Sequence, residues 1–314
     1  MNIKRQCTYL LVVACLALFI FSCKKQSIDE VQSGRVVAWG LDDHGQVSAV
    51  PEGDDFIAVS AGFRHSLALR KDGTIEAWGY DSMGQVDGTP EDDGFIAISA
   101  GYGHNIAIRE DGSLAIWGLD MDDQIINVPR GKDFVKVSAG FTSSLALKND
   151  GTLIAWGGTH IDDKMREFRQ TGREMKFKEI SVNRALHLAL TEDSSILPWG
   201  SDLLGSVYEA PKEKDFISVA AGARHGLAIR KDSTIAAWGW DQRNEVSDRP
   251  VQSGFVKVSA GYTHSIALHK DGTIHSWGWS RGNHGQVEDT PVDGNYIDIS
   301  AGIYHNLAIQ KTEK

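Results

Sequence analysis

Short apolar stretches separated by turn residues recur along the whole chain. In one clear copy of the pattern, Phe56–Val59 is apolar, His65–Leu69 alternates small and aliphatic side chains, and Thr74–Trp78 follows after a turn. Alternation with a period of two is typical of β-strands. The Asp72-Gly73 pair between the last two stretches suits a tight hairpin turn. Gly84-Gln85-Val86 then predicts a short fourth strand, so each copy predicts four antiparallel strands.

Two landmarks show that this pattern occurs seven times. A Trp-Gly pair recurs at intervals of 39 or 43 residues, and a Ser-Ala-Gly-x-x-His sequence, or a variant of it, keeps the same phase. Repeats of about 40 residues with several short strands are typical of β-propellers, and no stretch of the repeats has a helical period. The sequence therefore predicts an all-β, seven-bladed β-propeller of four-stranded blades. The Trp-Gly pairs begin at Trp39, Trp78, Trp117, Trp156, Trp199, Trp238 and Trp277.

The two ends of the repeated region predict how the propeller closes. The region begins on a third strand, at Arg35–Trp39, and finishes on a second strand, at His305–Gln310. The last copy therefore lacks its outer strands, and the N-terminal segment can supply them. Such an interlock removes the exposed strand edges of an open array. We expect one propeller domain over residues 35–311.

The repeat resembles that of a known family. Ala77-Trp78-Gly79, Gly84-Gln85-Val86 and the stretch from Ser60-Ala61-Gly62 to Leu69 are similar to repeats of the regulator of chromosome condensation family. The short period is similar in style to bacterial propellers such as β-lactamase inhibitor protein II. The resemblance implies a propeller fold and a binding function. One fold hosts many partners, so it names no partner for this chain.

Strand order assigns each loop to one face of the propeller. In an up-and-down blade, the loops after the first and third strands emerge together, opposite the Lys-Asp-Gly turns. The first face collects aromatic and arginine side chains, which are typical of interface hot spots. We predict that this face binds a partner; the alternative is that some rings pack between blades or plug the central channel. The predicted residues are Phe63, Arg64, Tyr80, Tyr102, Phe141, Arg224, Trp240, Tyr262, Trp279 and Tyr304.

Other recurring polar residues are interpreted as structural. A histidine occupies one repeat position at His65, His104, His225, His264 and His305, but that position is Ser143 and Leu186 in two copies. We expect these rings to bond within the fold, for example to neighbouring backbone groups, and predict no metal and no cofactor. An aspartate follows Trp-Gly-x in five copies and is expected to form a turn; these residues are Asp42, Asp81, Asp120, Asp202 and Asp241. We find no acid pair, nucleophile with a base, or phosphate loop, and predict that the protein is not an enzyme.

The fourth copy departs most from the pattern. It carries four extra residues after Trp156-Gly157, lacks the Gly-Gln-Val segment, and contains basic residues between positions 164 and 178. This segment is either a steering element for an acidic partner or a solvated loop, and the sequence leaves both open. A smaller insertion, Arg281–His284, lies in the last copy.

The N-terminal segment predicts export. Lys4 and Arg5 precede an apolar run that ends at Ser22-Cys23, which is the layout of an export signal over residues 1–22. Ile20-Phe21-Ser22-Cys23 resembles the lipobox of bacterial lipoproteins, which implies lipidation of Cys23 and a tether over residues 23–34. An ordinary cleaved signal or an uncleaved anchor are the alternatives. We expect a lipoprotein of the bacterial cell envelope, at the outer membrane or the cell surface.

These observations together predict the class of function. The net charge of −10 repels phosphate backbones, so nucleic acid is not expected as a partner. We expect a monomeric, membrane-anchored scaffold that binds a protein or a surface glycan. An inhibitor of a secreted enzyme, such as a β-lactamase, is the alternative. A hydrolase or lyase is a third, weaker interpretation.

Overall fold

The computed structural model describes residues 31–158, 175–202, 205–279 and 284–312 of the 314-residue chain. Every regular element among these residues is a β-strand. The strands are β1 (Gly34–Gly40), β2 (Phe56–Ala61), β3 (His65–Arg70), β4 (Ile75–Gly79), β5 (Phe95–Ala100), β6 (His104–Arg109), β7 (Leu114–Gly118), β8 (Phe134–Ala139), β9 (Ser144–Lys148), β10 (Leu153–Trp156), β11 (Phe177–Val182), β12 (Leu186–Thr191), β13 (Ile196–Gly200), β14 (Phe216–Ala221), β15 (His225–Arg230), β16 (Ile235–Gly239), β17 (Phe255–Ala260), β18 (His264–His269), β19 (Ile274–Gly278), β20 (Tyr296–Ala301) and β21 (His305–Lys311).

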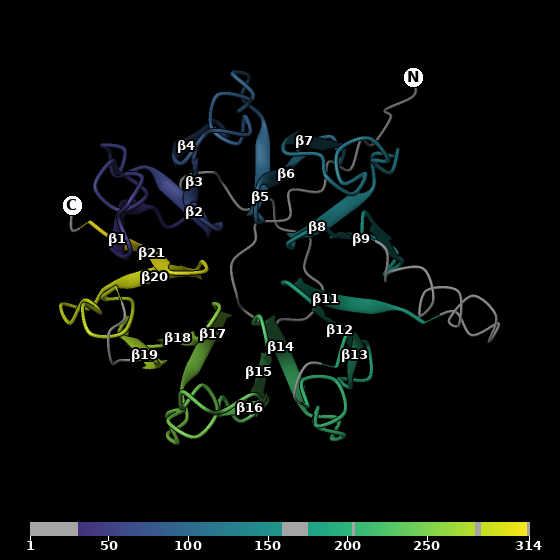
Figure 1. Ribbon diagram of the computed structural model, residues 1–314, viewed down its shortest axis with the longest axis vertical. Helices are drawn as coiled ribbons and strands as arrows, with labels where there is room; N and C mark the ends of the chain where they lie inside the picture. Colours follow the sequence, from purple (N-terminus) through teal and green to yellow (C-terminus); the bar gives the residue numbers. More distant parts are fainter. Residues whose placement is uncertain (1–30, 159–174, 203–204, 280–283, 313–314) are drawn as a thin grey trace, which may run out of the picture.

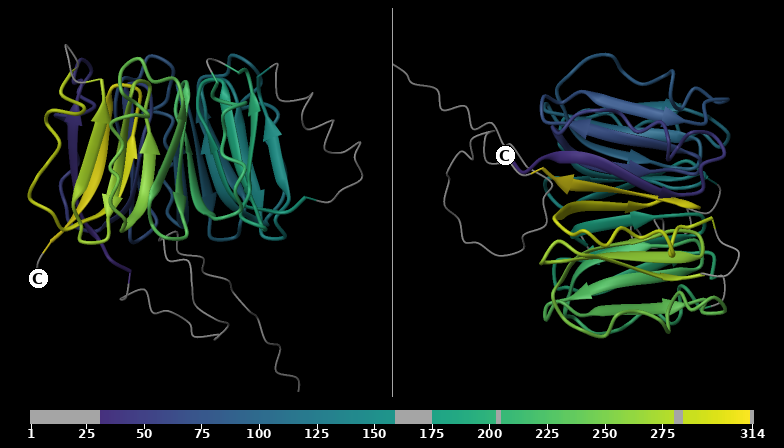
Figure 2. Two further views of the ribbon diagram at one scale, coloured as in Figure 1. Left: turned by 90° about the horizontal axis from the view of Figure 1, so that it is seen from below. Right: turned by 90° about the vertical axis from the view of Figure 1, so that its left-hand side faces the viewer.

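The strands form three-stranded antiparallel units that are repeated along the chain. Within each unit the strands are hydrogen-bonded in sequence order, as in β2-β3-β4, β5-β6-β7 and β14-β15-β16. Figure 1 shows the units arranged radially, with the first strand of each unit nearest the central axis and the third at the outside. Figure 2 shows the strands running between two layers of loops at opposite faces of the molecule. The fold is therefore all-β, with the layout of a propeller.

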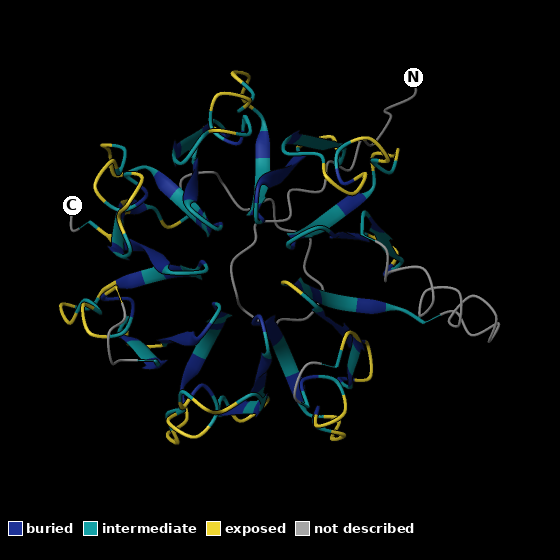
Figure 3. Ribbon diagram, viewed as in Figure 1, coloured by how far each residue is buried: buried dark blue, intermediate teal, exposed yellow. Residues whose placement is uncertain are grey.

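Neighbouring units pack face to face, which explains the alternating apolar pattern. Leu67 and Leu69 on β3 are fully buried against Phe95 on β5, Ala107 on β6 and Trp117 on β7 of the following unit. The same kind of cluster recurs at the other junctions, so the core is a series of layers between sheets. The second strand of each unit lies between its two sheet neighbours and is almost wholly buried. Figure 3 shows the exposed residues gathered in the loops at the rim.

The prediction of a fourth strand in each unit is wrong. Gly84-Gln85-Val86 forms a turn, and the described sheets have three strands per unit, because local hydrogen bonds satisfy this segment's backbone. The carboxylate of Asp81 accepts hydrogen bonds from the N–H groups of Val86 (2.6 Å) and Asp87 (3.1 Å). The N–H of Gly88 donates to the carbonyl of Gly84 (3.2 Å). The prediction that this aspartate forms a turn is confirmed, and Asp42, Asp202 and Asp241 make equivalent bonds.

The tryptophans of the Trp-Gly pairs join neighbouring units. Each ring is buried, and most of the indole N–H groups donate to a backbone carbonyl in the preceding turn segment. Trp78 Nε1 donates to the carbonyl of Gln46 (3.0 Å), and Trp117 Nε1 to that of Gln85 (3.1 Å). Trp199 has no such partner among the described residues. In the sequence, the segment between Trp156 and the unit of Trp199 lacks Gly-Gln-Val.

The two ends of the described chain lie side by side. β1 pairs antiparallel with β21 along its whole length, from Gly34 opposite Lys311 to Gly40 opposite His305. Trp39 on β1 is buried and its Nε1 donates to the carbonyl of Gln286 (3.1 Å). The sheet order β20-β21-β1 thus places β1 in the position of a third strand.

Candidate partner-binding face

The buried histidines form bonds from one unit to the next. His65 Nε2 lies 2.7 Å from Asn105 Oδ1, and His104 Nε2 lies 2.9 Å from Ser144 Oγ. The sequence predicted that these rings bond within the fold, for example to neighbouring backbone groups. The bonding partner is instead a side chain of the following unit. Further pairs join His225 to Ser265, His264 to Asn306 and His305 to Ser66.

The copy with serine in the histidine position makes the same bond with the roles exchanged. Ser143 Oγ lies 3.0 Å from Nε2 of His187, which occupies the position one residue after the usual histidine. Leu186 makes an apolar contact instead: it clusters with Trp238, and that ring fills the space beside Gly226. Among the described residues, no group of His, Cys, Asp and Glu side chains has the arrangement of a metal site.

Burial lowers the pKa of these imidazoles well below its usual 6.5. The pKa is about 4 for His65, His104, His187 and His264, and about 3 for His225 and His305; desolvation is the largest cause in each. They are therefore neutral at pH 7, as a structural role requires. The glycine of the Ser-Ala-Gly motif makes room for the ring, because a Cβ at Gly62 would lie 2.5 Å from His65 Cε1.

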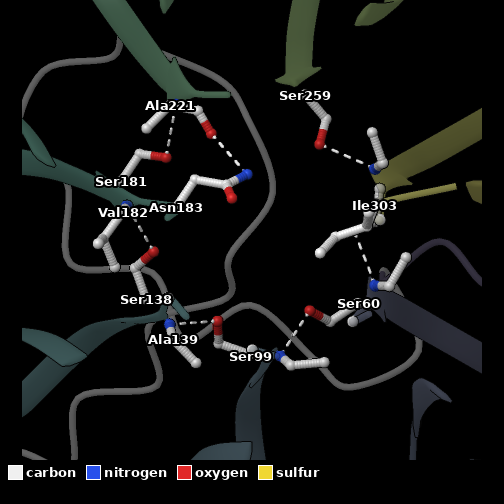
Figure 4. A pocket seen from close by; sticks show the side chains of 18 of the residues that line it. Ser60, Ser99, Ser138, Ala139, Ser181, Val182, Asn183, Ala221, Ser259 and Ile303 are labelled. Atoms are coloured by element: carbon white, nitrogen blue, oxygen red, sulfur yellow. Dashed lines mark hydrogen bonds between the residues drawn. The ribbon is translucent and has the colours of Figure 1, made fainter. Parts of the chain in front are cut away.

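The serines of the Ser-Ala-Gly motif surround a cavity at the centre of the molecule. Each hydroxyl accepts a hydrogen bond from an N–H of the following unit, as Ser60 Oγ does from Ala100 (2.9 Å) and Ser99 Oγ from Ala139 (2.9 Å). The series includes Ser300 Oγ, which accepts from the N–H of Ala61 (3.0 Å). Figure 4 shows these side chains around the cavity, which has a volume of about 130 Å³. Its wall is mostly Ser, Ala, Gly and backbone, which offers no reactive group.

The predicted aromatic residues cluster at this cavity. Phe63, Tyr102 and Phe141 line it and stack in sequence, with ring centroids 4.4 Å and 4.0 Å apart. Tyr304 continues the series, 6.4 Å from Phe63 and 6.0 Å from Tyr262. Five of the ten predicted residues, each from a different unit, therefore form one aromatic group. We call it the mouth cluster, and it consists of Phe63, Tyr102, Phe141, Tyr262 and Tyr304.

Arg64, Arg224 and Trp240 lie beside the mouth cluster, and Tyr80 is linked to it through His44 and Arg64. The Arg224 guanidinium lies 5.4 Å from the Trp240 ring and 5.7 Å from the Tyr262 ring. Arg64 lies 5.0 Å from Phe63 and also contacts His44, which packs on Tyr80 at 4.6 Å. These contacts bring loops after first strands together with loops after third strands, as the strand-order argument predicts.

The predicted residues are half-buried, and this keeps both interpretations of the face open. The rings pack on each other and line the cavity, as the packing alternative requires, yet each retains an accessible part, as a binding face requires. Trp279 carries the Arg243 guanidinium 3.6 Å from its ring centre. Arg243 was not among the binding residues predicted from the sequence.

Arg184 is the functional candidate that sequence reasoning missed. It occupies the repeat position of Phe63 and Tyr102, one residue after the glycine or its replacement Asn183. Its Nη1 donates to Tyr262 Oη (3.0 Å), and its guanidinium lies 5.9 Å from the Phe141 ring. Counting from Ser181 in the irregular copy would have found it.

Several sequence predictions fall outside the described residues. They are the export signal, Cys23 and most of its tether, the basic residues from 164 to 173, and Arg281 to Asn283. Lys176 and Lys178, at the end of the basic segment, contact Asp150 and Ser194. His284 packs edge-on to Tyr304 at 5.8 Å. In the described part of the chain, no helix is long and apolar enough to cross a membrane.

Comparisons with known proteins confirm the family resemblance. Residues 56–85, 134–159 and 255–286 match the regulator of chromosome condensation (RCC1) repeat. These three segments are thus repeats of the RCC1 type, in a fold with the layout of a propeller. No curated protein sequence matches it.

Solved structures share the fold at low sequence identity. Prp20p from Saccharomyces cerevisiae, described with its binding properties to Gsp1p and histones, is 17% identical over 94% of this chain and 97% of its own, with a TM-score of 0.71. Human WBSCR16 is 15% identical over 89% and 99%, with a TM-score of 0.69. The CRINKLY WD40 ectodomain of the Arabidopsis thaliana receptor kinase ACR4 is 20% identical over 82% and 93%, with a TM-score of 0.65. At this identity the likeness shows the fold alone.

Proposed function

We propose that this protein is an exported binding scaffold that recognises another protein through the mouth cluster and its neighbours. The observation that carries the proposal is the gathering of Phe63, Tyr102, Phe141, Tyr262 and Tyr304, with arginines beside them, on one face of the cavity. Aromatic and arginine side chains dominate the binding energy of protein interfaces. A surface glycan is the other partner class that such rings suit.

We propose further that the scaffold is a closed ring of seven blades, with β1 completing the last blade. Three contacts between the first and last repeats support closure. β1 pairs with β21, the N–H of Ala61 donates to Ser300 Oγ, and Ser66 bonds to His305. Closure covers the edge of β21 with β1, so it removes one exposed strand edge and favours a monomer.

The proposed location rests on the N-terminal sequence. Export by residues 1–22 and lipidation of Cys23 would tether the propeller to a bacterial envelope membrane. Changing Cys23→Ser should move the protein from the membrane fraction to the soluble fraction, as measured by immunoblotting of fractionated cells. A Cys7→Ser variant is the control and should stay in the membrane fraction. If the Cys23 variant stays there too, the lipid anchor is wrong.

The aromatic residues provide the direct test of the binding face. Replacing Tyr102, Tyr262 and Trp240 together by Ala should weaken capture of the native envelope partner at least about 100-fold, because each hot-spot residue is worth about 2 kcal/mol or more. The measurement is affinity capture with the immobilised full chain, followed by titration of the captured partner. An inhibition assay against secreted hydrolases, including β-lactamases, would identify a partner that is an enzyme.

A matched control separates recognition from folding. Tyr208 is exposed and lies outside the mouth cluster, so Tyr208→Ala should leave capture unchanged. Circular dichroism should show that the triple variant keeps its β-sheet signal. A folded triple variant that still captures the partner would rule out this face.

A further inference from the structure

Two arginines converge on one tyrosine of the mouth cluster. Arg184 donates from Nη1 to Tyr262 Oη at 3.0 Å, and the Arg224 guanidinium lies 5.7 Å from the centre of the same ring. They come from different units, in the β11–β12 and β14–β15 loops. Arg184 is exposed and Arg224 is half-buried, so both guanidinium groups are accessible to a ligand.

Neither arginine forms an ion pair with any described residue. On the strands, Arg70 pairs with Asp55 and Glu76, Arg109 with Asp92, and Arg230 with Asp215. Arg184 and Arg224 thus differ from these strand arginines.

Arg64 provides an internal comparison, because it occupies the same repeat position as Arg224. Arg64 Nη2 lies 3.2 Å from Asp43 Oδ2, and its guanidinium also contacts His44. The repeat position of Asp43 is occupied by Leu203 in the copy that precedes Arg224. The sequence thus places a carboxylate beside Arg64 and none in the corresponding position beside Arg224.

We propose that Arg184, Arg224 and Tyr262 bind the carboxylate of an Asp or Glu side chain in a segment of the partner protein, an inference that rests on the proposed function. Two guanidinium groups close to one ring repel each other, and an anion between them removes that repulsion. Guanidinium donors match carboxylate geometry, and the hydrogen bonds to a charged acceptor are strong. Arg184 is held between the Phe141 and Tyr262 rings, and Arg224 between Trp240 and Tyr262.

The flanking rings define the kind of segment. Phe141 lies beside one arginine and Trp240 beside the other, so apolar surface borders the cationic centre on two sides. The complementary ligand is an acidic residue with apolar or aromatic neighbours, which a peptide segment supplies. Because Arg184 and Arg224 are already placed by their aromatic contacts, they lose little conformational freedom on binding.

The test uses a fluorescein-labelled ten-residue peptide with Glu-Tyr pairs spaced by Gly-Ser, and the same peptide with Gln for each Glu. Binding to the full chain is measured by fluorescence anisotropy at low and at physiological salt. We expect the Glu peptide to bind at least about tenfold more tightly than the Gln peptide, and its binding to weaken with salt. Arg184→Gln and Arg224→Gln should each weaken it by about tenfold.

Arg130→Gln is the matched control, since this exposed arginine lies in the segment that leads into β8, outside the mouth cluster and its neighbours, and it should change binding less than about twofold. Equal binding of the two peptides, or an equal effect of Arg130→Gln, would overturn the proposal. So would a phosphoserine peptide that binds through Arg184 and Arg224 when the Glu peptide does not. Loss of partner capture in the aromatic triple variant, with capture intact in both Arg variants, would leave the binding face standing and remove only the carboxylate site.

Discussion

Lowering the pH from 7 to 5 should unfold this protein, well before most of its carboxylates are protonated. Six buried histidines have pKa values of about 4 or about 3 in the fold. The unfolded chain has the ordinary value of about 6.5. As the pH falls below that value, the unfolded state takes up protons that the folded state excludes. Stability is therefore complete above pH 6.5 and is lost progressively toward pH 4.

The hydrogen bonds explain why the folded rings resist protonation. In His65 and His264, Nε2 faces an Asn Oδ1 and must carry the proton, since each Asn amide nitrogen donates elsewhere. A second proton would have to enter on Nδ1, which is buried without a hydrogen-bond partner in these rings. At pH 5.5 each such group costs about 1.4 kcal/mol, and six cost about 8 kcal/mol, comparable to the whole stability of a typical domain.

The measurement is the free energy of unfolding by urea, followed by circular dichroism, at pH values from 7.5 to 5. A His104→Gln variant should be less stable at pH 7.5, but its stability should fall less steeply with pH, by about one proton. Gln can still bond to Ser144 Oγ, the partner of His104. The control is Ile108→Val at a buried residue without a titratable group, which should lower the stability at every pH and leave the slope unchanged. A free energy of unfolding that stays constant between pH 7 and 5 would contradict the prediction.

Removing β1 should abolish cooperative folding. A chain that begins at residue 42 loses the whole β1–β21 pairing and the buried side chains of Val36 and Trp39. Burial of each such side chain is worth about 1.5–3 kcal/mol, and the pairing of a full strand adds to this, so the loss approaches the total stability. β21 would also become an exposed edge that favours aggregation. Thermal unfolding followed by circular dichroism should show no sharp transition.

The control is a chain that begins at residue 31 and keeps β1, and it should unfold like the full protein. A synthetic peptide of residues 31–41 should restore the transition when added to the shortened chain. A shortened chain that unfolds at the same temperature as the control would mean that β1 does not close the ring.

Three strands of each unit were predictable because their apolar pattern repeats. The fourth strand was predicted wrongly because a side chain, and not a neighbouring strand, accepts the backbone N–H groups of that segment. Phe56, His65 and Trp78 lie on the expected strands because burial on both sides of each sheet imposes the apolar pattern. Gly84-Gln85-Val86 has one strand-favouring residue, and the Asp81 carboxylate takes up the backbone N–H groups. The five-residue spacing from Asp81 to Val86 is the signal for this turn.

The candidate site was predictable in its location and less so in its contacts. Loop order placed the aromatic residues on one face, since an up-and-down sheet alternates its loops. The histidine partners were recognisable in principle, because a polar residue such as Ser66 or Asn105 follows most of those histidines. The pairing of Arg184 with Tyr262 joins residues 78 positions apart across the cavity mouth, and no local pattern specifies it.

The hydrogen bonds that join neighbouring units are not equally complete around the molecule. Leu186 replaces a bonded histidine, Ala220 stands where other units have the serine that accepts an N–H, and Trp199 Nε1 has no acceptor among the described residues. All three lie on β12, β13 and β14. Each of these residues removes one polar link at a different junction between units, so apolar packing carries a larger share of the stability of these three junctions. Arg184 and Arg224, the arginines of the proposed carboxylate site, lie in loops of these same units.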